Sequence, residues 1–279
     1  MKTVTTINGR TVSRLDARVS VFDNALLYAE GLFETFLAIG NKALFCDEHL
    51  RRLHRGATVT GLPVPVSDAT LVKWMTQVLR KHPAHVKKLR LTVTSGESAR
   101  WAGKSGRPQV ILSASPHRFL DRPYRLHVSP LRVDQQSVFR RIKTISYAIH
   151  AAAIRQAMQR RCDDALLLNE AGNLAEVTSA NIFWVKKRKI YTPPLSAGCL
   201  EGVTRGIVMR EAEKLGLSVE ERNGTLHGLA NVDEVFISSS LKLVAPVSLI
   251  IDGRRQYHFR PGPVTAVLDR HFRSALAGI

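Results

Sequence analysis

The stretch RIKTISYAIHAAAIRQAMQRRCDDALLLNEAGNLAEVTSANIF, residues 141–183, contains most of the information about fold and chemistry. It places one lysine, Lys143, after an extended segment and before an alanine-rich helix. Further along, Glu176 lies on a predicted strand that leads into a cluster of hydroxyl and amide side chains at residues 178–181. An amine, a carboxylate and a group of hydrogen-bond donors therefore occur within one continuous stretch.

These are the groups that a pyridoxal-phosphate enzyme requires. A lysine amine forms a Schiff base with the cofactor, a carboxylate pairs with the ring nitrogen, and donors bind the phosphate. Taken alone, Lys143 could be a surface lysine at a strand end and Glu176 an exposed strand carboxylate. The pattern around them favours a catalytic Lys143 and a cofactor-binding set of Glu176, Thr178, Ser179 and Asn181.

Four more motifs join this stretch: GLFETFLAIGNK at residues 31–42, HLRRL at 49–53, LEGVTR at 200–205, and EVFISSS followed by APV at 234–247. In this order and spacing they resemble the fold-type IV pyridoxal-phosphate enzymes, or class IV aminotransferases. That family includes branched-chain aminotransferases, D-amino acid aminotransferases and aminodeoxychorismate lyase. The resemblance covers nearly the whole chain. It implies an α+β, two-domain fold like that of D-amino acid aminotransferase, with pyridoxal 5'-phosphate as cofactor.

The resemblance also implies residues for the phosphate and substrate sites. Arg52, the second arginine of HLRRL, is expected to pair with the phosphate. The LEGVTR motif precedes a predicted helix, whose first amides can point at an anion. The remaining cofactor-binding candidates are Gly202, Val203, Thr204, Ser239 and Ser240, and the substrate-binding candidates are Phe33, Thr35 and Arg100.

The sequence leaves the reaction open among relatives that share these cofactor residues. The FET segment at 33–35 and the compact chain look most like aminodeoxychorismate lyase, which eliminates pyruvate from 4-amino-4-deoxychorismate to give 4-aminobenzoate in the folate pathway. Phe33 stands where D-amino acid enzymes usually carry a tyrosine, and Ala102 where they carry a histidine. The alternative is a class IV aminotransferase that acts on branched-chain or D-amino acids with 2-oxoglutarate.

Composition and charge limit the kinds of ligand that the chain is expected to bind. The net charge of +18 could attract nucleic acid or small anions, but the basic residues are spread along the chain. The densest group, residues 186–189, is predicted to be a solvated hairpin turn, and no nucleic-acid-binding motif accompanies it. A small anionic substrate is therefore favoured over nucleic acid. The three cysteines form no C-x-x-C pair, so neither a disulfide framework nor a zinc site is expected.

Length and hydropathy suggest a cytoplasmic, two-domain protein. No apolar run of transmembrane length occurs, and the N-terminus lacks a signal-peptide core. We expect a smaller N-terminal domain over residues 1–117, a linker at 118–123, and a larger C-terminal domain over 124–279 that carries the lysine. Helices are predicted at 48–60, 68–80, 147–160, 204–215 and 263–276. By resemblance, the working unit is a homodimer with its sites at the interface.

Overall fold

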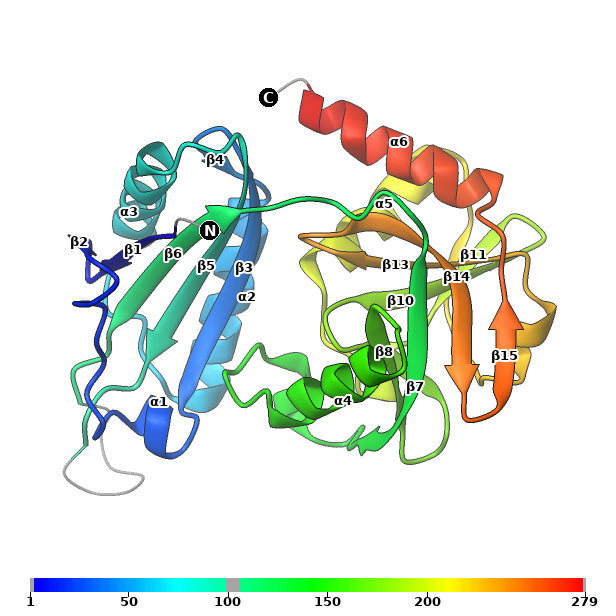
Figure 1. The fold of residues 1–279 in the computed structure, drawn as a ribbon, viewed down its shortest axis with the longest axis horizontal. Coiled ribbons are helices and arrows are strands. Elements are labelled where there is room, and N and C mark those ends of the chain that lie inside the picture. The colour runs from blue at the N-terminus through cyan, green and yellow to red at the C-terminus, as the bar shows by residue number, and fades with distance from the viewer. Residues whose placement is uncertain (1–2, 99–105, 278–279) are drawn as a thin grey trace. The chain divides into compact units, whose positions relative to one another are not determined.

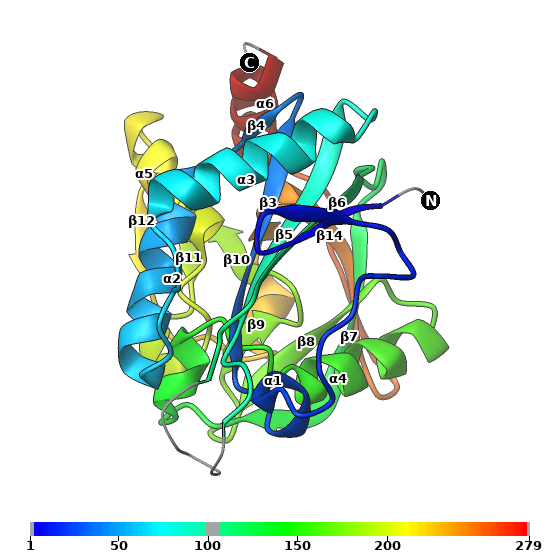
Figure 2. The same ribbon diagram turned by 90° about the vertical axis from the view of Figure 1, so that its left-hand side faces the viewer.

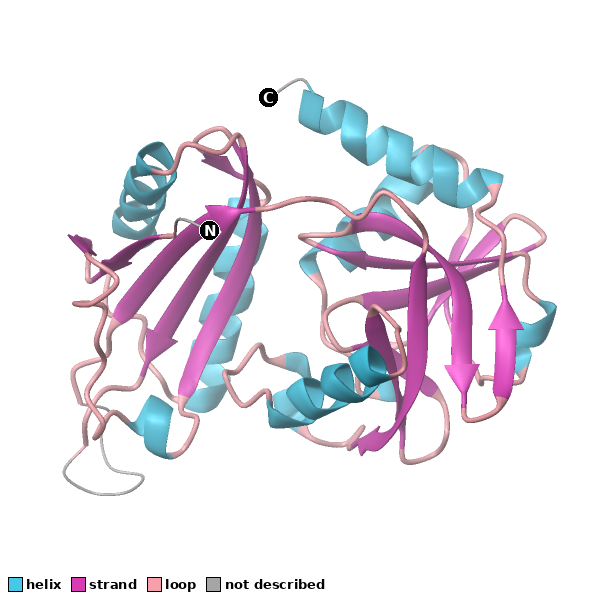
Figure 3. Cartoon of the chain, in the orientation of Figure 1, coloured by secondary structure: helices cyan, strands magenta, loops and turns pink. Residues whose placement is uncertain are grey.

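The computed structural model describes residues 3–98 and 106–277, which form two compact mixed α/β units (Figures 1 and 3). The first comprises Met1–Arg118 and Ile142–Ser146, and the second Phe119–Arg141 and Tyr147–Ile279. The sequence led us to expect Lys143 in the C-terminal domain, whereas the structure groups its segment with the first unit. The reason is backbone pairing, because Phe33 N donates to Lys143 O and Ile145 N donates to Gly31 O, both at 2.9 Å.

The first unit contains an antiparallel six-stranded sheet in the order β2-β1-β6-β5-β3-β4. An Asn8-Gly9 turn joins the first two strands, and both residues have positive φ, as this hairpin type requires. The strands are β1 (Val4–Ile7), β2 (Arg10–Val12), β3 (Gly31–Ile39), β4 (Lys42–Ala43), β5 (Val86–Thr94) and β6 (Val110–Pro116).

One face of this sheet is covered by α2 (Cys46–Thr60) and α3 (Asp68–Lys81), as Figure 2 shows. A short helix, α1 (Asn24–Leu27), precedes β3. Ser67 caps α3, because its hydroxyl accepts from Thr70 N. Helix α2 was predicted to begin at residue 48, but it begins two residues earlier, at Cys46, after Phe45 in a left-handed conformation. Asp47 lies in the first turn, where a negative charge interacts favourably with the helix dipole.

The second unit is built on a curled sheet in the order β12-β11-β10-β13-β14-β7-β8-β9, with β15 paired to β14. Lys187 and Arg188, both with positive φ, form the tight turn between β10 and β11, so the basic cluster is a hairpin turn as predicted. The strands are β7 (Tyr124–Val133), β8 (Asp164–Asn169), β9 (Leu174–Val177), β10 (Asn181–Lys186), β11 (Lys189–Thr192), β12 (Val219–Glu221), β13 (Glu234–Ser239), β14 (Leu243–Asp252) and β15 (Arg255–His258).

Helices pack on this sheet through small or apolar side chains. Helix α4 (Ala148–Gln159) buries Ala153 and Ala157 against β8, as its alanine-rich sequence suggested. Helix α5 (Val203–Lys214) packs on β13, and α6 (Pro263–Ala277) packs on β13 and β14. Three short 3₁₀ turns complete the unit: η1 (Val138–Arg141), η2 (Leu195–Ala197) and η3 (Gly228–Asn231). None of the helices in the described residues is both long and apolar enough to cross a membrane.

Candidate cofactor site

Lys143 lies beside β3 in the first unit. Its backbone carbonyl accepts from Phe33 N, and its amine nitrogen is 4.4 Å from the centroid of the Phe33 ring. The guanidinium of Arg90 lies 3.8 Å from the same centroid. Both are cation–π contacts, which fix a charged group over an aromatic face. The structure thus brings together the predicted catalytic lysine and one predicted substrate residue.

The register of the strands explains which side chains lie near Lys143. In the β3–β5 pair, Thr35 lies opposite Arg90 and Phe33 lies opposite Thr92. Residues directly opposite one another, and residues two apart on a strand, share a face of the sheet. These four side chains therefore share the face away from α2 and α3. We name this set, with the Lys143 amine, the lysine face. Sequence reasoning missed Arg90, because pattern alone cannot give the register that aligns it with Thr35.

Arg52 lies on α2, at the opposite face of β3. Its Nε and Nη2 donate to Glu34 Oε1 and Oε2 at 2.8 and 2.6 Å, and His49 Nδ1 lies 2.6 Å from Oε2. Burial raises the pKa of the Glu34 carboxyl. The charge and hydrogen bonds of Arg52, together with the hydrogen bond from His49, outweigh burial and lower the pKa from 4.5 to about 2. The buried pair fixes the guanidinium, and its role toward a phosphate stays a prediction.

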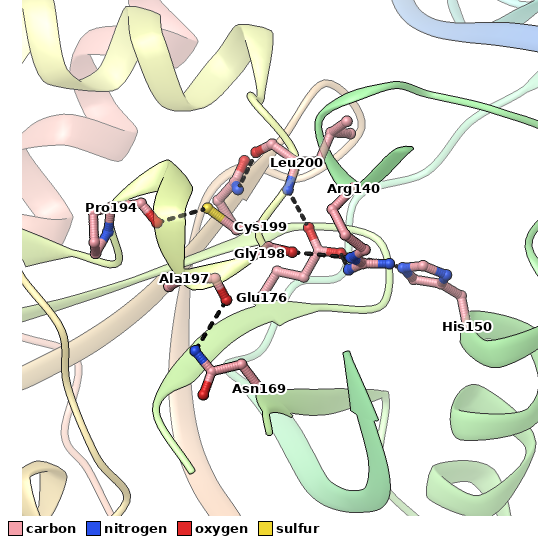
Figure 4. Close-up of polar contacts among 10 residues, drawn as sticks. Arg140, His150, Asn169, Glu176, Pro194, Ala197, Gly198, Cys199 and Leu200 are labelled. Carbon is pink, nitrogen blue, oxygen red and sulfur yellow. Dashed lines mark hydrogen bonds and ion pairs between the residues drawn. The ribbon is translucent and has the colours of Figure 1, made fainter. Parts of the chain in front are cut away.

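Glu176 is the centre of a polar cluster in the second unit (Figure 4). Its Oε1 accepts from Arg140 Nη2 and lies 3.2 Å from His150 Nε2, and its Oε2 accepts from Leu200 N at 2.8 Å. Burial raises the pKa of the carboxyl, but the His150 hydrogen bond, the charges of Arg140 and His150, and the Leu200 amide outweigh it and lower the pKa. The carboxylate is therefore ionised at neutral pH. The sequence identified Glu176 but not Arg140 or His150.

Thr178 and Ser179 follow Glu176, and both hydroxyls donate to the buried Asp164. Thr178 Oγ1 bonds to Oδ1, and Ser179 Oγ bonds to Oδ2 at 2.7 Å. Lys242 Nζ completes the cluster at 3.1 Å from Oδ2. The two hydroxyl hydrogen bonds hold the end of the strand in place. Because a hydroxyl has a single proton, neither hydroxyl can donate a second hydrogen bond. A phosphate contact from this segment stays a prediction and would use backbone amides.

Asn181 and Gly202 shape the start of α5. Asn181 Nδ2 donates to Leu200 O at 2.9 Å, which anchors the turn before the helix. A Cβ on Gly202 would lie 2.0 Å from Asn181 Oδ1, so a larger residue cannot be accommodated without rearrangement. Gly202 is the N-cap and makes no side-chain cap, so the first amides, including that of Val203, stay available. Thr204 Oγ1 is buried and has no hydrogen-bond partner in the described part of the chain.

A family model for class IV aminotransferases (Amino-transferase class IV) matches residues 31–250. The chain belongs to the class IV aminotransferase family. Among its relatives, a D-alanine aminotransferase from Bacillus licheniformis is 31% identical, with 92% of each chain covered. The aminodeoxychorismate lyase of Bacillus subtilis is 26% identical, with 97% of this chain and 94% of that protein covered.

Solved structures agree on the fold. The branched-chain aminotransferase of Thermoproteus uzoniensis with norvaline superposes with a TM-score of 0.91 at 26% identity, covering 99% of this chain and 95% of that one. The branched-chain amino acid aminotransferase of Escherichia coli gives a TM-score of 0.86 at 26% identity, with 97% of this chain and 93% of that one covered. The expected two-domain, fold-type IV class is confirmed.

Class IV aminotransferases use pyridoxal phosphate, and the side chains of this chain fit that cofactor. The start of α5 has amides without a side-chain cap and the Thr204 hydroxyl, which has no partner among the described residues, and these are the donors that a phosphate requires. Glu176 offers an ionised carboxylate for a ring nitrogen. Within residues 3–98 and 106–277, no three or more His, Cys, Asp or Glu side chains are grouped so that they could hold a metal ion.

The two remaining predicted segments are less informative. Ser239 ends β13, and its carbonyl accepts from Lys242 N across the turn that contains Ser240. The neighbouring Ser238 hydroxyl is buried and has no hydrogen-bond partner among the residues described. Cofactor binding by Ser239 and Ser240 stays a prediction. Arg100 lies outside the described residues, so its predicted substrate contact is not addressed by the structure.

Proposed function

We propose that the chain is an aminodeoxychorismate lyase, which eliminates pyruvate from 4-amino-4-deoxychorismate to form 4-aminobenzoate. The observation that supports this is the composition of the lysine face. It combines an amine, an aromatic ring, a hydroxyl and a guanidinium, supplied by Lys143, Phe33, Thr35 and Arg90. A cyclic substrate with two carboxylates offers a match for both the ring and the cation.

The proposed residues have distinct chemical roles. Pyridoxal phosphate, when bound, supplies an electron sink for the bond changes at the substrate carbon. The amine of Lys143 would hold the cofactor and take the proton from the amine-bearing carbon. The Glu176 carboxylate would pair with the ring nitrogen, and the start of α5 would bind the phosphate.

Arg90 is the described residue best suited to a substrate carboxylate. Its guanidinium is held over Phe33, and its Nε lies 3.2 Å from Thr92 Oγ1. An arginine offers a planar fork of donors that matches a carboxylate in bidentate fashion. Arg100 remains a second candidate from the sequence. The net charge of +18 would also favour the approach of an anionic substrate.

An aminotransferase is the alternative, and the relatives support it. The D-alanine aminotransferase is more similar in sequence than the lyase, at 31% against 26% identity. A branched-chain or D-amino acid aminotransferase with 2-oxoglutarate would use the same lysine and carboxylate. Both reactions begin with proton removal at the amine-bearing carbon, so the cofactor groups do not separate them.

Product analysis separates the two reactions. The enzyme loaded with pyridoxal phosphate is incubated with 4-amino-4-deoxychorismate, and separately with L- or D-amino acids plus 2-oxoglutarate. We expect equal amounts of 4-aminobenzoate and pyruvate in the first mixture and little glutamate in the second. Rapid glutamate formation without 4-aminobenzoate would establish the aminotransferase instead.

A cytoplasmic homodimer is proposed as the working form. Several apolar side chains near the N-terminus of the first unit are exposed, which is unusual for a surface that stays in water. The exposed fractions include 82% for Leu15, 68% for Phe22 and 65% for Leu26. A second copy covering this segment would remove them from solvent. Light scattering should give twice the mass of the chain, and an active monomer would reject the dimer.

A further inference from the structure

We propose that Arg140 and His150 are positioning residues that keep the Glu176 carboxylate ionised and turned so that Oε2 receives the N–H of the cofactor ring. The proposal deepens the proposed function and rests on it only for the use of pyridoxal phosphate, not for the choice between lyase and aminotransferase. Arg140 lies outside the motifs that carry the family resemblance, and His150, although within the 141–183 stretch, was not among the predicted site residues. Both are placed by the geometry of the second unit.

The number of hydrogen bonds on each carboxylate oxygen of Glu176 shows which oxygen can accept another one. A carboxylate oxygen has two lone pairs and can accept two hydrogen bonds. Oε1 of Glu176 receives two contacts, from Arg140 and His150, and is fully engaged. Oε2 receives one contact within the described residues, from Leu200 N. One acceptor position therefore remains, and it is on Oε2.

The donors are themselves held by separate elements. Arg140 belongs to η1, and its Nε donates to Gly198 O at 3.0 Å. His150 is on α4, where its ring stacks on Tyr147 at a centroid distance of 4.1 Å. Leu200 is anchored through its carbonyl by Asn181. Rotation of the carboxylate would break contacts to three different parts of the unit, so its orientation is fixed before the cofactor binds (Figure 4).

These contacts also affect whether the Glu176 carboxyl carries a negative charge. A buried carboxyl tends to take up a proton, and a neutral carboxyl loses its attraction for a protonated ring nitrogen. Among the described residues, the side chains that act on Glu176 or are acted on by it include Arg140, His150 and the thiol of Cys199. Arginine stays charged in proteins, whereas burial, with the nearby Glu176 charge, raises the pKa of Cys199 to about 12 and keeps it a neutral thiol. Arg140 is therefore the permanent cation, and His150 adds a directed hydrogen bond.

The test measures binding of two cofactors in the absence of substrate. One is pyridoxal phosphate, and the other is its 1-deaza analogue, in which CH replaces the ring nitrogen. We expect the unmodified protein to prefer the natural cofactor by about tenfold or more, the usual value of one charge-assisted hydrogen bond. Arg140→Gln and His150→Leu should reduce this preference to near unity. His150→Gln, which keeps a side-chain N–H, should restore part of it.

Controls separate positioning from folding. Arg141→Gln, at the exposed neighbour on η1, should leave the preference unchanged. In a Glu176→Gln background, Arg140→Gln should have no further effect on the preference, because it acts through that carboxylate. Unfolding temperatures identify any variant that simply fails to fold, in which case the conservative His150→Gln decides.

The outcomes are distinct. If the unmodified protein binds neither cofactor, the proposed function fails. If it prefers pyridoxal phosphate and the folded Arg140 and His150 variants keep the full preference, the cofactor assignment stands and the positioning role is overturned. Loss of binding for both cofactors to the same extent would also overturn the role, because it would indicate general damage to the site.

Discussion

Glu34 in the first unit and Glu176 in the second are both buried and have partners of the same residue types, but they differ in which elements those partners come from. Glu34 pairs with Arg52 and His49, and Glu176 pairs with Arg140 and His150. In the first unit a bidentate arginine engages both oxygens of Glu34, and His49 adds to Oε2. In the second unit the arginine and histidine converge on one oxygen, and a backbone amide takes the other.

The difference shows how one set of residue types can serve structure or chemistry. The contacts of Glu34 join β3 to α2 at the helix-covered face of the sheet, and its side chain is fully buried. Within the described residues each glutamate has two contacts on one oxygen and one on the other, but the singly engaged Oε2 of Glu176 lies next to the turn that begins α5. We therefore propose that Glu34 stabilises the first unit and that Glu176 serves the cofactor.

Lys143→Ala should give the largest loss. Without a lysine amine at this position, neither the covalent link to the cofactor nor the proton transfer can occur, and activity should fall by at least about a thousandfold. Borohydride reduction followed by mass spectrometry should find no cofactor attached to the variant. Lys189→Ala, at an exposed ion pair with Glu220, serves as the control. Retention of a reducible link would reject the assignment of Lys143.

Glu176→Gln should slow turnover about a hundredfold, because a well-placed charge contributes on the order of 3 kcal/mol to a transition state. The substitution keeps the size of the side chain, so the unfolding temperature should change little. Turnover is measured with saturating pyridoxal phosphate. Unchanged turnover would show that Glu176 does not act on the ring, and the contrast with Glu34 would then disappear.

Glu34→Gln should instead reduce stability and its dependence on pH. The pKa of Glu34 is lowered from 4.5 to about 2, so its contribution is complete above about pH 4.5 and is lost as the pH falls toward 2. By linkage the contribution is on the order of 3 kcal/mol. Urea unfolding at several pH values checks this. The unmodified protein should lose stability across this window more steeply than the variant, and parallel curves would contradict the assignment.

The sequence could predict the parts of this picture that depend on local pattern. The helices, the hairpins at Asn8-Gly9 and residues 187–188, and the family motifs follow from periodicity, turn residues and spacing. The partners of the glutamates could not be predicted in this way. Arg140 lies 36 residues from Glu176 and His49 lies 15 from Glu34, and their contacts depend on packing and on strand register. For the same reason Lys143 was expected in the C-terminal domain.

Arg90→Ala tests the lysine face with a smaller effect. Loss of one carboxylate partner should raise the apparent KM for the anionic substrate about tenfold, equivalent to roughly 1.4 kcal/mol, while the bound cofactor spectrum is unchanged. Arg90→Lys should restore binding only in part, because lysine provides charge without the bidentate fork. A variant that loses cofactor but keeps its KM would place Arg90 in the cofactor site and remove support for the lyase.

Cys199 offers the smallest and most local test of the contrast. Burial is the main reason that its thiol pKa is raised to about 12, and the charge of Glu176 adds to it. The native protein should therefore label very slowly at Cys199 with a thiol reagent at about pH 8, where little thiolate forms. Glu176→Gln removes the neighbouring charge, so the Cys199 pKa should fall and its labelling should quicken modestly.

Peptide mapping distinguishes Cys199 from Cys162, a buried cysteine for which Glu176 is not among the causes of the raised pKa. Glu34→Gln should leave the Cys199 rate unchanged, since Glu34 is not among the causes of the raised Cys199 pKa. Equal acceleration at both cysteines would indicate general loosening of the unit, and the charge of Glu176 would no longer explain the result.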